Sequence, residues 1–252
     1  MLIPRVIPSL LLDDDVLVKT IRYGDPTYVG DPVNVINIFN RFEVDEIVLL
    51  DISATPAGRK PSFRLIEELA AECWVPLTYG GGITELEDVR HILGSGVEKV
   101  VLNTIRADDP DLITRVADVF GSQAVVVSVD ARQVGPGRHE VFVAGGARSL
   151  GIDPITSARG AEALGAGEIL LNSIDRDGTM EGYDLDLIRT VAVQVGIPVI
   201  ACGGAGERRH LADPILAGAS AVAAGSIFVY RGPTRGVLVN FPERVQLEAL
   251  LG

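Results

Sequence analysis

The stretch Val75-Pro76-Leu77-Thr78-Tyr79-Gly80-Gly81-Gly82 decides the fold of this chain, because a variant of it occurs a second time. The counterpart, Ile197-Pro198-Val199-Ile200-Ala201-Cys202-Gly203-Gly204, begins 122 residues later (197 − 75). Two more pairs share this offset, namely residues 46–50 with 168–172 and residues 96–100 with 218–222. A constant offset close to half of the 252 residues predicts two similar halves.

Short apolar runs alternate with stretches of helical spacing along the whole chain. The predicted strands cover residues 5–12, 46–52, 75–79, 99–103, 124–130, 168–174, 198–202 and 221–228. The predicted helices cover residues 62–72, 86–95, 109–120, 155–164, 184–195 and 207–217. Such alternation predicts an α/β fold, a (β/α)8 TIM barrel with two-fold half-barrel pseudo-symmetry, over residues 1–252 as a single domain. The alternative is an open doubly wound sheet, which usually carries a phosphate loop after its first strand, and none follows Leu12.

Composition excludes several classes of protein. The apolar fraction of 47% is too high for a disordered chain and allows a large core. The net charge of −12 and the pI near 4.7 argue against partners such as nucleic acid or an anionic membrane. A small phosphorylated ligand remains possible, because a few backbone N–H groups can hold it. The two cysteines and the lack of a secretory or membrane-spanning pattern suit the cytoplasm.

Small residues follow the predicted strands at two places in each half. Gly81 and Gly82 follow one strand, and Asn103-Thr104 follows the next. The second half repeats this arrangement with Gly203-Gly204 and then Gly225-Ser226. A single glycine cluster usually marks only a tight turn. Two copies at one offset predict two phosphate sites and therefore a ligand with a phosphate at each end.

Carboxylates stand at or just after the ends of three predicted strands, at Asp51, Asp130, Asp175 and Asp177. Carboxylates there point into the mouth of a barrel, where proton transfer takes place. Aspartate also caps helices, so both interpretations stay open for Asp51 and Asp177. Asp130 is the stronger catalytic candidate, because a Gly/Pro-containing loop follows it. The three scattered histidines predict no metal site, and we expect no cofactor.

Four charged residues begin strands at the opposite end of the predicted barrel. They are Arg5, Glu46, Lys99 and Glu168, and Glu46 and Glu168 are repeat equivalents. Ordinary solvated residues are the simplest interpretation. If the four side chains point inward, they form a ring of ion pairs across the barrel floor. Such a ring is weak evidence for stability, so it suggests gating or docking.

The chain resembles the cyclase subunit family of imidazole glycerol phosphate synthase over nearly its full length. The resemblance is carried by segments 30–32, 45–52, 80–83, 103–104, 120–127, 165–171, 173–179, 182–184 and 203–206. It implies a barrel that takes ammonia from a glutaminase docked on its floor and uses it on a bis-phosphorylated substrate at its mouth. It also implies that Asp130 is catalytic and that Arg5, Glu46, Lys99 and Glu168 form the ammonia gate. The phosphate-binding set is then Gly81, Gly82, Asn103, Thr104, Asp177, Gly178, Gly203, Gly204, Gly225 and Ser226.

The chain departs from this family at one catalytic position. The family's other catalytic aspartate lies at the end of the first strand, and Leu11 occupies that place here. Lys19 still matches the family pattern, which supports this alignment. Lys19 and Asp51 are further residues that we expect at the mouth. Leucine cannot transfer a proton, and loss of a general acid–base group typically costs about 10²–10⁴-fold in rate.

A divergent branch resembles the chain further, through segments 7–12, 17–20, 28–34, 71–79 and 236–242. This branch consists of the glycosyl amidation-associated paralogues of surface-polysaccharide gene clusters. The resemblance implies a glutaminase partner and a separate sugar amidotransferase that turns an acetamido group of a nucleotide sugar into an acetamidino group. Three hypotheses follow: an ammonia-handling barrel for sugar amidation, a true cyclase-lyase of histidine biosynthesis, or a non-catalytic scaffold that activates its glutaminase.

Overall fold

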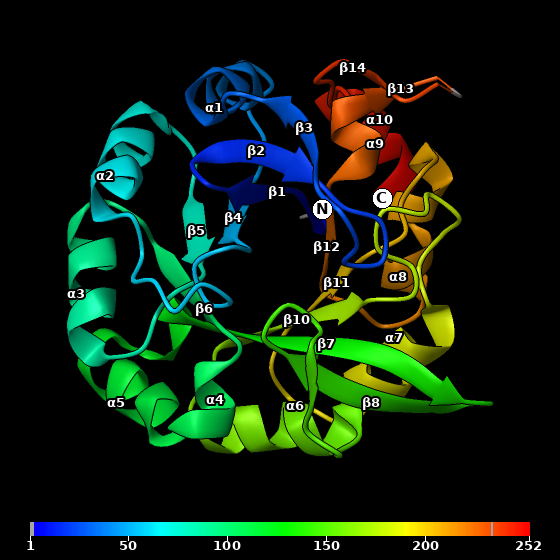
Figure 1. Cartoon of the computed structure of the whole chain (residues 1–252). Coiled ribbons are helices and arrows are strands. Elements are labelled where there is room, and N and C mark those ends of the chain that lie inside the picture. The colour runs from blue at the N-terminus through cyan, green and yellow to red at the C-terminus, as the bar shows by residue number, and fades with distance from the viewer. Residues whose placement is uncertain (1–2, 233) are drawn as a thin grey trace.

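A closed barrel of eight parallel strands forms the centre of the molecule in the computed structural model, which describes residues 3–232 and 234–252 (Figure 1). The strands are β1 (Arg5–Asp13), β4 (Ile47–Asp51), β5 (Leu77–Gly80), β6 (Lys99–Leu102), β7 (Val125–Gly135), β10 (Glu168–Ser173), β11 (Val199–Cys202) and β12 (Ala221–Ala224). Pairing of β12 with β1 closes the ring, and β7 pairs directly with β10. The predicted (β/α)8 fold is confirmed.

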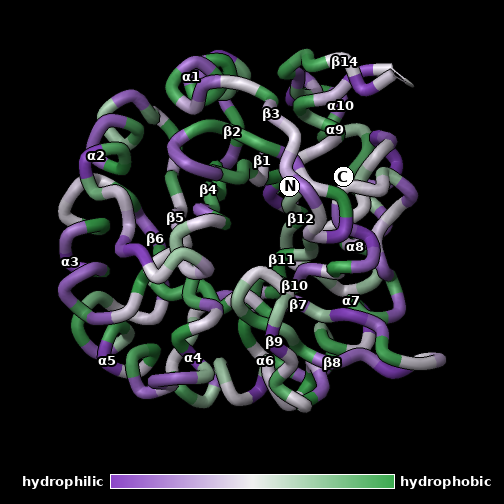
Figure 2. The backbone as a smooth tube through the Cα atoms, in the orientation of Figure 1, coloured by the Kyte–Doolittle hydropathy of each residue, from purple (hydrophilic) through white to green (hydrophobic). Residues whose placement is uncertain are grey.

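Helices surround the barrel because each has one apolar face that packs on the strands (Figure 2). They are α1 (Pro32–Arg41), α2 (Phe63–Glu72), α3 (Leu86–Gly94), α5 (Asp111–Phe120), α6 (Pro154–Ala163), α7 (Leu185–Ala192), α8 (Asp213–Leu216) and α10 (Arg244–Leu251). Asp31 and Asp153 cap α1 and α6, each with proline in the first turn.

The remaining elements lie mainly in the connections that leave the carboxyl ends of the strands. They are β2 (Val16–Lys19), β3 (Thr27–Gly30), α4 (Ile105–Asp108), η1 (Ser122–Ala124), β8 (Arg138–Val143), β9 (Arg148–Ser149), η2 (Arg208–Leu211), α9 (Ser226–Val229), β13 (Tyr230–Arg231) and β14 (Gly236–Val237). The β2–β3 hairpin continues the sheet from the end of β1. These connections build the mouth of the barrel.

The sequence repeat has a structural counterpart in the glycines. Gly81 and Gly203 adopt φ angles of 118° and 91°, and Gly82 and Gly204 adopt 70° and 120°. Residues with a side chain rarely adopt such positive φ angles, so both copies of the motif require glycine. The half-barrel relationship therefore includes the turns that follow β5 and β11.

The structure corrects several predicted boundaries. The last predicted strand, 221–228, ends at Ala224, and Ser226–Val229 is helical. The predicted helix 207–217 is divided into η2 and α8, with Pro214 in the first turn of α8. The sequence analysis also missed α1, the β2–β3 hairpin and the β8 strand. Each of these elements lies in a connection, where long-range contacts outweigh local pattern.

Candidate active site at the mouth of the barrel

A cavity of about 800 Å³ opens at the carboxyl ends of the strands. It brings together the mouth residues that the sequence predicted, from segments far apart in the chain, except Asp175, whose carboxylate lies outside the lining and accepts from the N–H of Gln133 at 2.7 Å. Its lining includes Leu11, Lys19, Asp51, Gly81, Gly82, Asn103, Thr104, Asp130, Asp177, Gly178, Gly203, Gly204, Gly225 and Ser226. Active sites of (β/α)8 enzymes lie at this end, so the cavity is the candidate active site.

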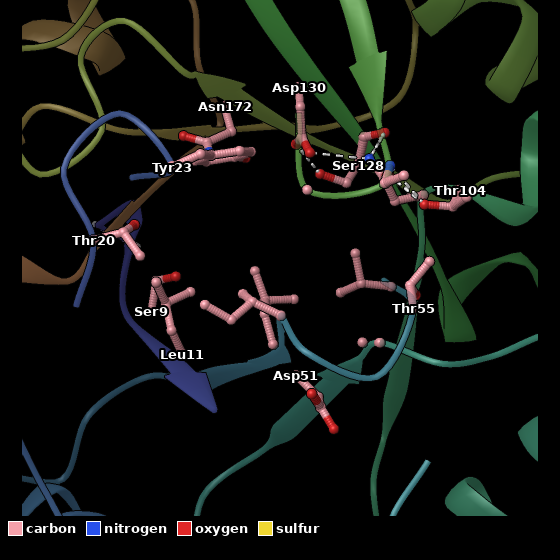
Figure 3. A pocket seen from close by; sticks show the side chains of 18 of the residues that line it. Ser9, Leu11, Thr20, Tyr23, Asp51, Thr55, Thr104, Ser128, Asp130 and Asn172 are labelled. Carbon is pink, nitrogen blue, oxygen red and sulfur yellow. Dashed lines mark hydrogen bonds between the residues drawn. The ribbon is translucent and has the colours of Figure 1, made fainter. Parts of the chain in front are cut away.

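Asp130 lies at the cavity wall near the middle of β7 and is 7% exposed. The Ser128 hydroxyl donates to Oδ1 at 2.7 Å, and Asn103 Nδ2 donates to Oδ2 at 3.1 Å (Figure 3). Burial raises the pKa of Asp130 to about 6, although the hydrogen bond from Ser128, the nearby Tyr23 hydroxyl and the charge of Arg106 oppose the shift. A carboxylate with this pKa can exchange a proton near neutrality.

Leu11 faces Asp130 across the cavity with an apolar wall (Figure 3). It pairs in register with Leu50 of β4, which also lines the cavity. Asp13, the nearest carboxylate on β1, is not among the lining residues. The register of β1 therefore provides no acidic replacement at this position.

The two predicted phosphate sites differ in the polar groups that they offer to an anion. The N–H of Gly82 donates to the Thr55 hydroxyl at 3.2 Å. The Thr104 hydroxyl donates to Asn103 Oδ1 and accepts from the N–H of Ala144. At the second pair, a Cβ atom added to Gly225 would lie 2.1 Å from Lys19 Nζ, so the buried ammonium group sits directly against this glycine. The second site therefore has a cation beside it.

Asp51 and Asp177 are engaged in holding loops. Asp51 Oδ1 accepts from the N–H groups of Ser53 and Ala54 and from the Ser53 hydroxyl. Asp177 Oδ2 accepts from the Thr20 hydroxyl at 2.9 Å, and the N–H of Asp177 donates to the carbonyl of Ser173. Neither the N–H nor this carboxylate oxygen of Asp177 is free for a phosphate, and the geometry favours the structural interpretation for both residues.

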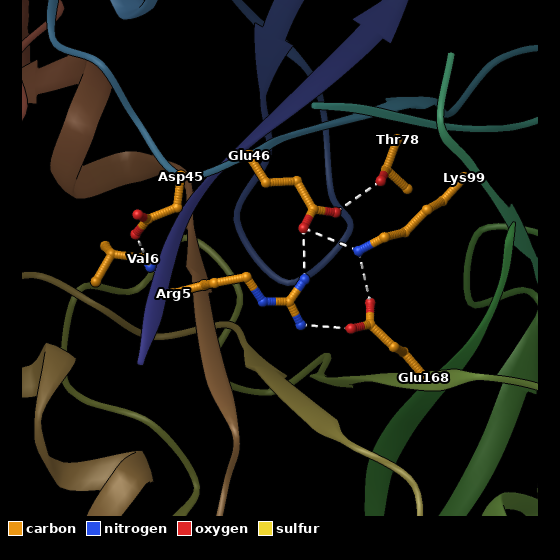
Figure 4. Close-up of polar contacts among 7 residues, drawn as sticks. All are labelled: Arg5, Val6, Asp45, Glu46, Thr78, Lys99 and Glu168. Atoms are coloured by element: carbon orange, nitrogen blue, oxygen red, sulfur yellow. Dashed lines mark hydrogen bonds and ion pairs between the residues drawn. The ribbon is translucent and has the colours of Figure 1, made fainter. Parts of the chain in front are cut away.

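The four charged residues at the floor form a closed ring inside the barrel (Figure 4). Arg5 bridges Glu46, at 2.6 Å, and Glu168. Lys99 Nζ bridges the same two carboxylates at 3.0 Å each. The Thr78 hydroxyl adds a bond of 2.7 Å to the other oxygen of Glu46. Burial opposes the charge of Arg5, yet both carboxylates outweigh it and raise the pKa of its guanidinium.

An apolar layer separates the ring from the mouth. Side chains two residues apart on a strand point to the same side, so the layer begins two residues after each charged residue. Its members are Ile7, Val48, Val101, Val126, Leu170, Ile200, Cys202, Ala221 and Ala223. Burial raises the pKa of the Cys202 thiol to about 12, which keeps it protonated. Transfer of a charge into such an apolar layer costs more free energy than transfer of a neutral group.

Sequence reasoning missed Tyr23 and Asn172, which meet at the cavity. Asn172 Nδ2 donates to the Tyr23 hydroxyl at 2.6 Å, across 149 residues of chain. Asn172 is a polar residue near the end of the predicted strand 168–174, which is a signal that could have identified it. Tyr23 lies in a connection without a periodic pattern, and its neighbours give no such signal.

Within residues 3–232 and 234–252, no group of three or more His, Cys, Asp or Glu side chains is placed to hold a metal ion. In the same part of the chain, no helix has the length and apolar character required to cross a bilayer.

Comparison with known proteins supports the resemblance. Residues 5–234 match the family model described as histidine biosynthesis protein. A Pseudomonas aeruginosa protein named "Putative imidazole glycerol phosphate synthase subunit hisF2" is 50% identical over 245 residues, which cover 97% of this chain and 98% of the relative. A HisF relative from Leptospira interrogans is 46% identical over 99% of both chains, and hisF3 from Vibrio vulnificus is 42% identical over 96% and 94%. The chain therefore belongs to the histidine biosynthesis protein family, as a relative of imidazole glycerol phosphate synthase subunit HisF.

Proposed function

We propose that this barrel receives ammonia at its floor from a glutaminase partner and delivers it to a phosphorylated ligand at its mouth. The observation that carries the proposal is the order of features along the barrel axis. The ring of Arg5, Glu46, Lys99 and Glu168 is followed by the apolar layer and then by the cavity. Ammonia is small and neutral, whereas ammonium carries a charge, so ammonia suits an apolar passage that excludes ions.

The ring is suited to gating because both cations contact both anions. Opening a path past Lys99 breaks two ion pairs, while Arg5 continues to bridge Glu46 and Glu168. Burial of four charges is expensive unless the geometry is good, and apolar replacements are often equally stable. A ring of this kind is therefore better explained by a function at the axis than by stability alone.

Exposed apolar side chains surround the floor and support a docked partner. They lie where helices lead back into strands, at the same end as the ring: Phe42, Trp74, Val119, Val193 and Leu216. Trp74 is 78% exposed and Leu216 is 85% exposed. Exposed tryptophan is typical of the anchor residues of interfaces. A glutaminase seated here would cover this rim and release ammonia at the ring.

For the use of this ammonia, we propose amidation of an acetamido group on a nucleotide sugar, a step that a separate sugar amidotransferase carries out as a further partner. Leu11 supports this proposal, because cyclase chemistry in the family needs a carboxylate there. Asp130 supports the alternative of a true cyclase-lyase, since its pKa of about 6 suits proton transfer. A scaffold that only activates its glutaminase is the third candidate.

Reconstitution with the glutaminase and the sugar amidotransferase from the source cell tests the proposal. We expect glutamine-driven amidation of the nucleotide sugar to require all three proteins. Ammonium-driven turnover of the histidine-pathway substrate by the barrel alone would favour the cyclase. A third result would favour the scaffold. In that case the barrel activates the glutaminase, but the amidotransferase forms the same amount of product with and without the barrel when ammonium is supplied freely.

A further inference from the structure

The segment between β2 and β3 carries Tyr23 into the mouth. Arg22 and Tyr23 adopt φ angles of 53° and 60°, a region that bulky residues rarely occupy. Contacts with the segment after β10 hold this backbone: the N–H of Arg22 donates to the carbonyl of Asp177 at 2.9 Å, and the Thr20 hydroxyl donates to its carboxylate. The conformation that directs Tyr23 inward is therefore maintained by tertiary contacts.

The Tyr23 hydroxyl lies where two barrel strands present polar side chains. Asn172 of β10 and Asp130 of β7 are register partners, so their side chains are neighbours in the wall. Asn172 donates to the Tyr23 oxygen at 2.6 Å, which leaves the hydroxyl proton available for another acceptor. Figure 3 shows Tyr23, Asn172 and Asp130 grouped opposite Leu11.

We propose that Tyr23 is a positioning residue for Asp130: Asn172 orients its hydroxyl, which donates to the carboxylate. The hydroxyl thereby provides a second polar group at a mouth that lacks a carboxylate at position 11. The inference deepens the proposed function by naming a residue of the same site. It rests on the proposed function only for the identity of the reaction that Asp130 takes part in. The effect of Tyr23 on the titration of Asp130 is independent of that function, because the titration needs no substrate.

The charge balance at Asp130 explains what Tyr23 does. Burial raises the pKa of Tyr23 well above its ordinary value, so the hydroxyl stays a donor at neutral pH. A donor stabilises the ionised carboxylate and opposes the effect of burial. Other titratable groups around Asp130 come from four more segments, and these are Lys19, Arg106, Asp177 and Cys202. Removal of one hydroxyl leaves all four in place.

Carboxyl ¹³C NMR of the full chain, with Asp130→Asn to assign the signal, measures the titration of Asp130. Tyr23→Phe removes the hydroxyl and keeps the ring. We expect the midpoint to rise by about one pH unit, which matches one hydrogen bond to a charged group. Tyr28→Phe, at an exposed tyrosine of β3, is the matched control and should leave the midpoint unchanged.

Two results would overturn the proposal. An unchanged midpoint in folded Tyr23→Phe would show that the hydroxyl does not act on Asp130. A lower midpoint would show that Tyr23 only shields the carboxylate from water. Neither result would bear on whether a glutaminase delivers ammonia through the barrel.

The role of Asn172 is tested separately by a double-mutant cycle. Asn172→Ala should raise the midpoint in the parent chain, because the hydroxyl loses its orientation. In the Tyr23→Phe background the same change should have at most half that effect. Equal effects in both backgrounds would contradict an arrangement in which Asn172 acts through Tyr23.

Discussion

Leu11 and Asp130 divide the mouth into an apolar and a polar half. Leu11 packs in register with Leu50, while Asp130 holds hydrogen bonds to Ser128 and Asn103. Position 11 therefore offers no group that exchanges a proton opposite Asp130. Chemistry that needs a second carboxylate is not supported by these side chains.

The first prediction concerns cyclase activity. The isolated protein should show little or no ammonia-dependent turnover of the histidine-pathway substrate, because Leu11 cannot transfer a proton. Leu11→Asp should raise this turnover by about 10²-fold or more, the usual contribution of general acid–base catalysis. Leu11→Asn is the matched control and should not. Wild-type turnover within tenfold of an ordinary cyclase subunit would refute the prediction.

The second prediction concerns pH and Asp130. Its pKa is about 6 in the folded protein and about 3.8 as an ordinary aspartate. The folded state binds more protons between these values, so this residue makes stability fall as pH rises from about 4 to 6. Asp130→Asn should therefore stabilise more at pH 8 than at pH 4, by roughly 2 kcal/mol.

Urea unfolding of wild type and variant at the two pH values measures this difference. The same substitution at the exposed Asp186 serves as control. If Asp130→Asn changes the free energy of unfolding equally at both pH values, burial does not perturb this carboxyl group as described.

At the scale of elements, the connections after the strands carry the site, and the barrel holds them in place. The turns after β5 and β11 repeat their glycine conformations, and the β2–β3 hairpin after β1 has its counterpart in β8 and β9 after β7. The repeat therefore predicts two similar anion sites. Lys19, from that hairpin, distinguishes the second site from the first.

The third prediction concerns the two anion sites. Crystals soaked in phosphate should show one anion near Gly82 and Asn103-Thr104 and another near Gly204 and Gly225-Ser226. Gly204→Ala should remove only the second, because its Cβ would lie 2.2 Å from the carbonyl oxygen of Gly182 at a φ of 120°.

Gly137→Ala is the control for this experiment, since that glycine also has a positive φ but no neighbour within 4 Å of the new atom. It should leave both anions in place. Absence of anions at both pairs of loops in the wild-type crystal would contradict the two-site interpretation.

At the scale of the whole molecule, floor and mouth are joined by one axis. The ring, the apolar layer and the cavity are successive layers of the same strands, each displaced by two residues. If ammonia follows the proposed path along this axis, a change at the floor alters its delivery without touching the cavity.

The fourth prediction concerns the ring. In the three-protein system, Lys99→Met should change glutamine-driven product formation, because the barrier at the axis changes. Fold and glutaminase affinity should stay nearly unchanged, since Arg5 still pairs with both carboxylates. Ammonium-driven product formation is the internal control and should be unaffected. Equal glutamine-driven yields for variant and wild type would contradict the hypothesis that the ring gates ammonia.

The fifth prediction concerns docking at the floor. Trp74→Ala should weaken glutaminase binding by at least tenfold, as measured by calorimetry. Tryptophan side chains at the centre of interfaces often contribute about 2 kcal/mol or more of binding free energy. Tyr28→Ala removes another exposed aromatic side chain, 62% exposed, from the mouth end and should leave affinity unchanged. Unaltered affinity of Trp74→Ala would place the partner elsewhere.

The sequence by itself determined the barrel, its half-barrel repeat and most residues of the site. Strand periodicity and the positive-φ requirement of Gly81 and Gly203 are local properties, so they are readable without the fold. The charged ring was also predictable, because Arg5, Glu46, Lys99 and Glu168 stand at or next to the starts of strands in one barrel and the pleat directs them to one layer.

Only the tertiary structure decided what the connections do. Tyr23 meets Asn172 across 149 residues, and Thr20 meets Asp177 across 157. Such contacts hold Tyr23 in a backbone conformation that its own sequence disfavours, and they use the Asp177 carboxylate that the sequence left open between two roles. The physical reason is that connections have no repeating pattern of their own, so their conformation depends on partners that only the closed barrel brings within reach.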